Sequence, residues 1–114
     1  MNEEIKFFIK NILDFDLDND FIFIKDNNLN YVYANEKFCD FFKVSLKNLK
    51  GMNDQYLMID NLSLKKCKES DLFTLNNNFF ISDEIVFDQK YRVLKLKINL
   101  ENHKPGILCL AKVK

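Results

Sequence analysis

Apolar residues recur at helical spacing along the first fifteen residues of the chain, with charged residues between them. This pattern predicts an amphipathic helix over Met1 to Phe15. Its apolar side holds Ile5, Phe8, Ile9 and Ile12. The acidic run from Asp14 to Asp20 then predicts a polar link. We therefore expect residues 1–20 to form a helix and a link ahead of one domain that covers residues 21–114.

Two short apolar segments predict a β-hairpin next. Phe21 to Ile24 and Tyr31 to Ala34 are rich in residues that favour strands, and polar residues separate them. Asn27 and Asn28 tolerate a left-handed backbone, so we expect them to form the turn. Asn35 follows the second strand, and its side-chain oxygen is expected to cap a helix.

The middle of the chain predicts helices, and the last third predicts strands. The expected elements are helices near 36–42, 45–51 and 62–75, and strands over 79–87, 92–100 and 107–113. Alternation of leucine and lysine, as in Leu94, Lys95 and Leu96, predicts a sheet with one dry face. Strands that flank a helical insert are typical of an α+β domain with one antiparallel sheet and helices on one face.

The composition fits a folded domain and disfavours nucleic acid and membrane as partners. Of 114 residues, 47% are hydrophobic and twelve are Phe, which is enough for a core. Seventeen basic and seventeen acidic residues cancel, and all basic residues but one are Lys. No apolar run approaches the roughly 20 residues that cross a bilayer, and Glu3 and Glu4 stand where a signal peptide carries positive charge. A cytoplasmic location is expected.

Side chains for metal or enzymatic chemistry are scarce. The cysteines are Cys39, Cys67 and Cys109, with no Cys-x-x-Cys pair. The single histidine, His103, falls in a predicted turn, so neither a zinc site nor a Cys–His nucleophile is indicated. Asp83 and Glu84 are adjacent in a predicted strand and point to opposite faces, which does not suit acid–base catalysis. We expect no enzyme and no bound metal.

The order of the elements and three local motifs resemble the PAS sensory domain. The motifs are Asp26 at the end of the first strand, Asn35 at the head of the helix, and the Leu49-Lys50-Gly51 step. The resemblance covers Phe21 to Val113 and implies five antiparallel strands with helices packed across them. It implies a non-enzymatic sensory or regulatory module in signal transduction. At the hairpin position where the family usually has Gly, this chain has Leu29.

The resemblance disfavours two cofactor chemistries. Family members that form a light-driven flavin–thiol adduct use a Gly-x-Asn-Cys-Arg segment, and Gly51 to Gln55 is similar in frame. Asp54 stands at the position of the reactive cysteine, and Gln55 at that of the arginine. Haem-binding members ligate iron through a histidine on the long helix, where this chain has none. Flavin binding without an adduct and binding of an unidentified small ligand stay open.

Apolar side chains between sheet and helices are expected to form the pocket for any such ligand. The predicted pocket residues are Phe38, Phe42, Tyr56, Leu57, Leu72, Leu96 and Cys109. A pocket of this composition suits a small neutral aromatic or aliphatic ligand.

The leading helix either covers the domain's own sheet or pairs with its copy in a second chain. We expect a homodimer through Ile5, Phe8, Ile9 and Ile12, with a signalling protein as a further partner. The alternative is a structural dimerisation or docking module whose core is filled by its own side chains. A third reading, a small α+β enzyme with a cystatin-like curved sheet, would need polar groups inside the sheet cavity, where we expect apolar ones.

Overall fold

The computed structural model describes residues 3–86 and 88–114, and of Val86 only the backbone. The helices are α1 (Glu3–Phe7), the π-helical turn η1 (Phe8–Ile12), α2 (Glu36–Phe42), α3 (Leu46–Leu49), the 3-10 turn η2 (Asp54–Leu57) and α4 (Asn61–Asn77). The strands are β1 (Phe21–Asp26), β2 (Tyr31–Ala34), β3 (Phe79–Val86), β4 (Gln89–Asn99) and β5 (Pro105–Val113). Met1, Asn2 and Phe87, which the sequence assigns to the first helix and to a strand, lie outside the described residues.

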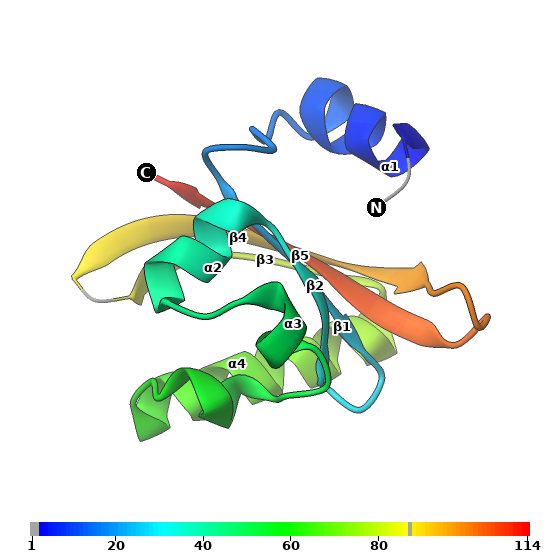
Figure 1. Cartoon of the computed structure of the whole chain (residues 1–114). Helices are drawn as coiled ribbons and strands as arrows, with labels where there is room; N and C mark the ends of the chain where they lie inside the picture. The colour runs from blue at the N-terminus through cyan, green and yellow to red at the C-terminus, as the bar shows by residue number, and fades with distance from the viewer. Residues whose placement is uncertain (1–2, 87) are drawn as a thin grey trace.

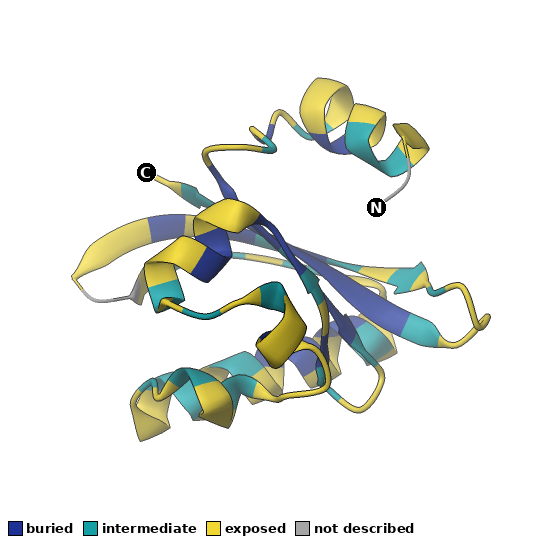
Figure 2. Cartoon of the chain, viewed as in Figure 1, coloured by how far each residue is buried: buried dark blue, intermediate teal, exposed yellow. Residues whose placement is uncertain are grey.

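One antiparallel sheet organises the chain. Its strand order is β2-β1-β5-β4-β3, and each neighbouring pair is antiparallel. The central strand β5 is buried from Gly106 to Leu110 (Figure 2). Helices α2, α3 and α4 lie on one side of the sheet, and α1 lies on the other (Figure 1). The predicted α+β class with a five-stranded antiparallel sheet is confirmed.

The N-terminal segment covers the outer face of the sheet. Ile9 of η1 is fully buried, and Phe15 is buried beside it. Both belong to a core cluster with Ile22, Ile24, Leu108 and Leu110, against which Leu94, Leu96, Ile98 and Leu100 pack. The leucines of the alternating strand therefore face the N-terminal segment. The other face of the sheet is also covered, so the prediction of a sheet with one dry face is wrong.

The first helix is shorter than its apolar pattern predicts. It ends at Ile12, and the backbone turns left-handed at Asp14, with φ 59°. The Asp16 carboxylate then accepts hydrogen bonds from the backbone N–H of Asp18 and Asn19. Such Asx contacts favour a turn over a continued helix, so residues 13–20 form an irregular link.

The β1–β2 hairpin turns at a different residue from the one expected. Leu29, and neither Asn27 nor Asn28, takes the left-handed backbone, with φ 65°. The Asp26 carboxylate fixes this geometry, because it accepts hydrogen bonds from Asn28 N at 2.9 Å and from Asn30 N at 3.0 Å. The side-chain contacts of Asp26 thus offset the strain at Leu29.

The predicted cap of α2 by Asn35 is confirmed, and the same side chain also forms hydrogen bonds with β1 and with the link before it. Asn35 Oδ1 accepts from the backbone N–H of Phe38 at 3.1 Å and from that of Ile22 at 3.3 Å. Its amide donates to the carbonyls of Leu17 at 3.0 Å and Asp20 at 2.7 Å. One buried side chain therefore joins the link, β1 and α2.

Candidate functional site

A cavity of about 120 Å³ lies on the inner face of the sheet, beneath α2, η2 and α4. Most of its wall is aromatic. The rings around it include Phe21, Phe23, Tyr31, Phe38, Phe42 and Tyr91. They also pack on one another, with ring centroids 4.8 Å apart for Phe23 and Phe38 and 4.7 Å apart for Phe38 and Phe42.

Strand alternation explains which side chains reach the cavity. Successive side chains of a strand point to opposite faces, so every second residue faces the same way. On β1 these residues are Phe21, Phe23 and Lys25, and on β4 they are Tyr91, Val93 and Lys95. Each strand thus places two apolar residues and then a lysine in the cavity wall. The cavity has an aromatic part and a charged end.

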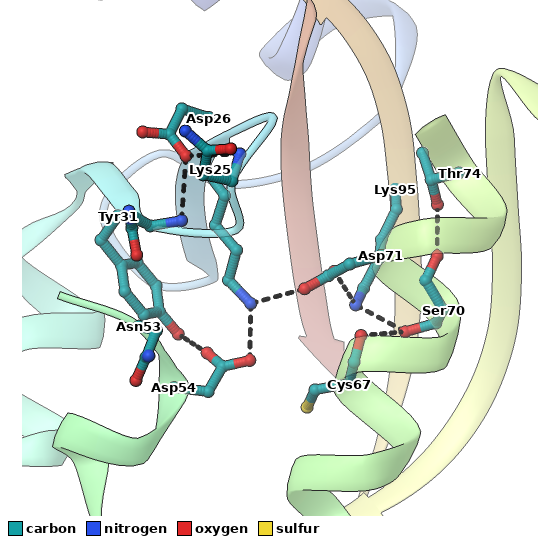
Figure 3. A network of polar contacts seen from close by, with 12 residues as sticks. Lys25, Asp26, Tyr31, Asn53, Asp54, Cys67, Ser70, Asp71, Thr74 and Lys95 are labelled. Atoms are coloured by element: carbon teal, nitrogen blue, oxygen red, sulfur yellow. Dashed lines mark hydrogen bonds and ion pairs between the residues drawn. The ribbon is translucent and has the colours of Figure 1, made fainter. Parts of the chain in front are cut away.

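Lys25 is the centre of a buried polar network at that end (Figure 3). Its side chain is 1% exposed, and its ammonium donates to Asp54 Oδ2 and to Asp71 Oδ2, both at 2.7 Å. The hydroxyl of Tyr31 donates to the other oxygen of Asp54. Lys25 therefore joins β1 to η2 and to α4.

Asp71 connects Lys25 to a second buried lysine. Lys95 Nζ donates to Asp71 Oδ1 at 2.6 Å and to Ser70 Oγ at 2.7 Å. Two ammonium groups and two carboxylates, of Asp54 and Asp71, make up the network, so their formal charges cancel. Among the described residues, every buried side-chain nitrogen and oxygen has a hydrogen-bond partner. This arrangement meets the condition under which charges are tolerated in a protein interior.

The network keeps its two lysines charged and the Tyr31 hydroxyl protonated. Burial lowers the pKa of Lys25, but the carboxylates of Asp71 and Asp54 outweigh it and leave that pKa above the ordinary value. Burial likewise opposes the charge on Lys95, and Asp71 helps to raise its pKa. Burial and the Asp54 carboxylate raise the pKa of Tyr31 well above its usual range. The Tyr31 hydroxyl therefore stays protonated at neutral pH and donates its hydrogen bond to Asp54.

Helix α4 turns polar residues toward the sheet. Ser70 and Asp71 lie three and four residues after Cys67, and Thr74 lies four and three residues after them, which places all four on one side of the helix. Ser70, Asp71 and Thr74 are buried, whereas Leu72 and Phe73 are exposed. The sequence reading missed this because it placed apolar residues of α4 inward. The sequence did hold one indication of the inward side of α4. Asp71 lies in the same helical stripe as Cys67, and Lys25 and Lys95 at inward strand positions can pair with it.

The structure brings together part of the predicted pocket. Phe38, Phe42 and Leu57 line the cavity. Tyr56 and Leu72 do not line it and are exposed, because η2 and α4 turn other side chains inward.

Two predicted pocket residues on the sheet also fall outside the cavity wall. The prediction that Leu96 lines the pocket is wrong, since strand alternation places its side chain on the outer face beneath the N-terminal segment. Cys109 is fully buried in the central strand, and burial raises its pKa to about 12. Residues that the sequence reading missed are Lys25, Tyr31, Asp54 and Lys95.

The predicted dimerisation residues divide into two groups. Ile9 is fully buried against the chain's own sheet, and Ile5 packs at the edge of the same cluster. Ile9 is therefore not available for contact with a second chain, and the prediction that it lies in a dimer interface is corrected. Phe8 and Ile12 are exposed, as is their neighbour Phe7.

Other chemistry is not evident at the described residues. Across residues 3–86 and 88–114, no group of His, Cys, Asp and Glu side chains is arranged to hold a metal ion. Within the same ranges, no helix is long and apolar enough to cross a membrane.

The adjacent carboxylates Asp83 and Glu84 point to opposite faces of the sheet, as predicted. Asp83 forms ion pairs with Arg92 and Lys114, while Glu84 lines the cavity.

Comparison with known proteins rests on structure alone, since no family model and no curated protein matches the sequence. A domain of an HTR-like protein from Haloarcula marismortui superposes with a TM-score of 0.73 at 12% identity, over 83% of this chain and 97% of that one. A sensory box sensor histidine kinase from Vibrio cholerae gives 0.70 at 13% identity, over 97% and 93%.

A third similar structure was solved with a ligand. The PAS domain of the quorum-sensing receptor RpfR from Cronobacter turicensis, in complex with C12:0, gives a TM-score of 0.64 at 13% identity. The match covers 83% of this chain and 93% of that one. Identities this low carry the fold and not the activity. The strand order, the helices across the inner face and these superpositions together establish that the chain has the PAS fold.

Proposed function

We propose that this chain is a non-enzymatic sensory domain that binds a small apolar or aromatic ligand in the cavity between the sheet and α2, η2 and α4. The aromatic wall of that cavity is the observation that carries the proposal. Ligand sites are usually concave and mostly apolar, with a few polar groups that orient the ligand. The polar end formed by Lys25 and Lys95 fits this description. The ligand-bound PAS domain of RpfR gives further support.

The size of the cavity limits the ligand. Its volume is about 120 Å³. An engineered apolar cavity of about 150 Å³ takes up benzene, so a single six-membered ring is the appropriate scale. A larger ligand would need η2 or α4 to move outward.

Benzene is accordingly expected to bind and to stabilise the folded chain. At a concentration ten times its Kd, a ligand that binds only the folded state adds about 1.4 kcal/mol to the free energy of unfolding. Ala111→Leu fills the cavity from β5 and is expected to abolish this effect, because Ala111 lines the wall. Thermal unfolding with and without benzene measures both results.

Val113→Leu is the matched control for that substitution. Val113 lies two residues further along β5, on the same side of the strand, and is 55% exposed. We expect this variant to respond to benzene like the unmodified chain. Equal responses from all three proteins, or none from the unmodified chain, would contradict a ligand role for the cavity.

Exposed apolar residues on the outer side of the molecule favour a second candidate function, homodimerisation. Phe7 and Ile12 are each 64% exposed. On β3, Phe79 and Ile81 are exposed and pair in register with Leu96 and Leu94, which face the N-terminal segment. Both sets of side chains thus lie on the outer side of the sheet. A second copy of the chain, which carries the same apolar surface, is the proposed occupant.

The double substitution Phe7→Lys and Ile12→Lys is expected to convert such a dimer into a folded monomer. Light scattering after size exclusion gives the mass, and circular dichroism reports the fold. Leu62→Lys is the control, because Leu62 is 63% exposed but belongs to α4 on the other side of the sheet. A monomeric unmodified chain at every concentration would exclude this second function.

A further inference from the structure

We propose that the cavity selects a neutral, compact ring that carries one hydrogen-bond acceptor, and that Lys95 donates a hydrogen bond to that acceptor. This inference rests on the proposed function, because it names the chemical class of ligand for the same cavity. It follows from three observations on the polar end. They concern the unused donor of Lys95, the different surroundings of Lys25, and the charges around the cavity.

Lys95 has one N–H more than its partners use. An ammonium group has three donors, and Lys95 Nζ spends two of them on Asp71 and Ser70. Among the described residues, the third has no hydrogen-bond partner. Lys95 is 3% exposed and lines the cavity. A buried ammonium with an unused donor at the edge of an apolar cavity favours a ligand that supplies an acceptor.

Lys25 is the weaker candidate for this contact. It also spends two donors, on Asp54 and Asp71. Its ammonium, however, lies 5.1 Å from the ring centroid of Tyr31 and 5.8 Å from that of Phe23. The aromatic faces therefore already stabilise the remaining side of this cation. In Figure 3 Lys25 lies between Asp54 and Asp71, whereas the end of Lys95 lies by Asp71 and Ser70.

The charges around the cavity favour a neutral ligand. Lys25 and Lys95 stand against four carboxylates, since Asp54, Asp60 and Glu84 line the cavity and Asp71 bridges the lysines. The carboxylates outnumber the ammonium groups, so an anionic ligand would add to an existing excess of negative charge. A cationic ligand would meet two buried ammonium groups at the polar end. A neutral acceptor avoids both costs and still uses the free donor.

Benzene and pyridine test this inference, because they share a shape and differ by one ring nitrogen that accepts a hydrogen bond. We expect Lys95→Met to lower the ratio of pyridine affinity to benzene affinity at least about tenfold, the value of one hydrogen bond to a charged donor. Benzene binding should persist in this variant. Lys97→Met is the control, since Lys97 is the next residue on the same face of β4 but is exposed. Calorimetric titration at pH 7.5 gives the Kd values.

A second measurement needs no substitution. The nitrogen-15 resonance of labelled pyridine bound to the unmodified chain should lie nearer its position in water than its position in cyclohexane. An unchanged affinity ratio in Lys95→Met, or a bound resonance near the cyclohexane position, would overturn the inference and leave the proposed function intact. Preference for benzoate or N-methylpyridinium over pyridine would also overturn it. Failure of benzene and pyridine alike to bind would instead remove the proposed function itself.

Discussion

Replacing Asp71 by alanine is expected to reduce the free energy of unfolding by about 3–5 kcal/mol, the cost of removing one partner from a buried ion pair. Asp71 is fully buried and accepts hydrogen bonds from both buried lysines. Without it, Lys95 keeps only Ser70, and Lys25 keeps only Asp54. Domains of this size are stabilised by about 5–15 kcal/mol in total, so the loss is a large share. Urea unfolding followed by circular dichroism measures it.

Asp83→Ala provides the matched control. Asp83 also pairs with two cations, Arg92 and Lys114, but all three side chains are at the surface. Solvent screens such pairs, so we expect a small effect that salt reduces further. The prediction fails if the two alanine variants are equally stable.

The quadruple variant Lys25→Met, Asp54→Asn, Asp71→Leu and Lys95→Met separates charge from packing, and the side-chain oxygen of its new asparagine can still accept from the Tyr31 hydroxyl. Replacing a complete buried ion cluster with uncharged residues of similar size is often neutral or stabilising. We therefore expect the quadruple variant to recover most of the stability that Asp71→Ala loses. Recovery would mean that the intact cluster contributes little to the net free energy of unfolding.

The fold could be predicted from local patterns because each element carries its own signal. Asn35 predicts the start of α2, a run of asparagines predicts the end of α4, and alternating leucines predict β4. Errors arose where a side chain several residues away decides the local conformation. The left-handed residue of the hairpin is Leu29 because the Asp26 carboxylate holds the backbone N–H groups on either side of it.

The polar half of the site could not be predicted in the same way. Lysine at alternate strand positions normally indicates a face in water, and Lys95 follows that pattern while being buried. Lys95 can be buried because it pairs with Asp71, which lies on a helix 24 residues earlier in the chain. Only the folded chain shows that the two lysines share this carboxylate. The aromatic half was easier, because Phe38 and Phe42 fall on the inner side of a capped helix.

The buried network also explains the orientation of α4. A helix with exposed Leu72 and Phe73 and buried Ser70 and Thr74 does not lie on the sheet by hydrophobicity alone. Ion pairs to Lys25 and Lys95 fix which side of the helix faces inward. Buried polar groups serve orientation in this way when every member has a partner. Rotating α4 to bury its leucines would leave Lys95 without a carboxylate partner and Lys25 with Asp54 alone.

Replacing Asn35 by alanine is expected to reduce the free energy of unfolding by about 3 kcal/mol, through the loss of a helix cap and of further buried hydrogen bonds. Its oxygen accepts from two backbone N–H groups, and its amide donates to the carbonyls of Leu17 and Asp20. Alanine leaves all four groups without this partner. Urea unfolding again gives the value, and hydrogen exchange should show the largest loss of protection in α2 and at Ile22.

Two further variants divide the effect between the cap and the amide. Asn35→Ser keeps an oxygen that can cap Phe38 but has no donor that reaches the two carbonyls, so its loss should be about half that of alanine. Ser45→Ala removes only the solvent-exposed cap of helix α3 and should cost about 1 kcal/mol. If Asn35→Ala costs no more than Ser45→Ala, the amide contacts to the link contribute nothing. The N-terminal segment would then be held to the domain by the apolar cluster around Ile9 and by the contacts of Lys112 with Asp14 and Asp20.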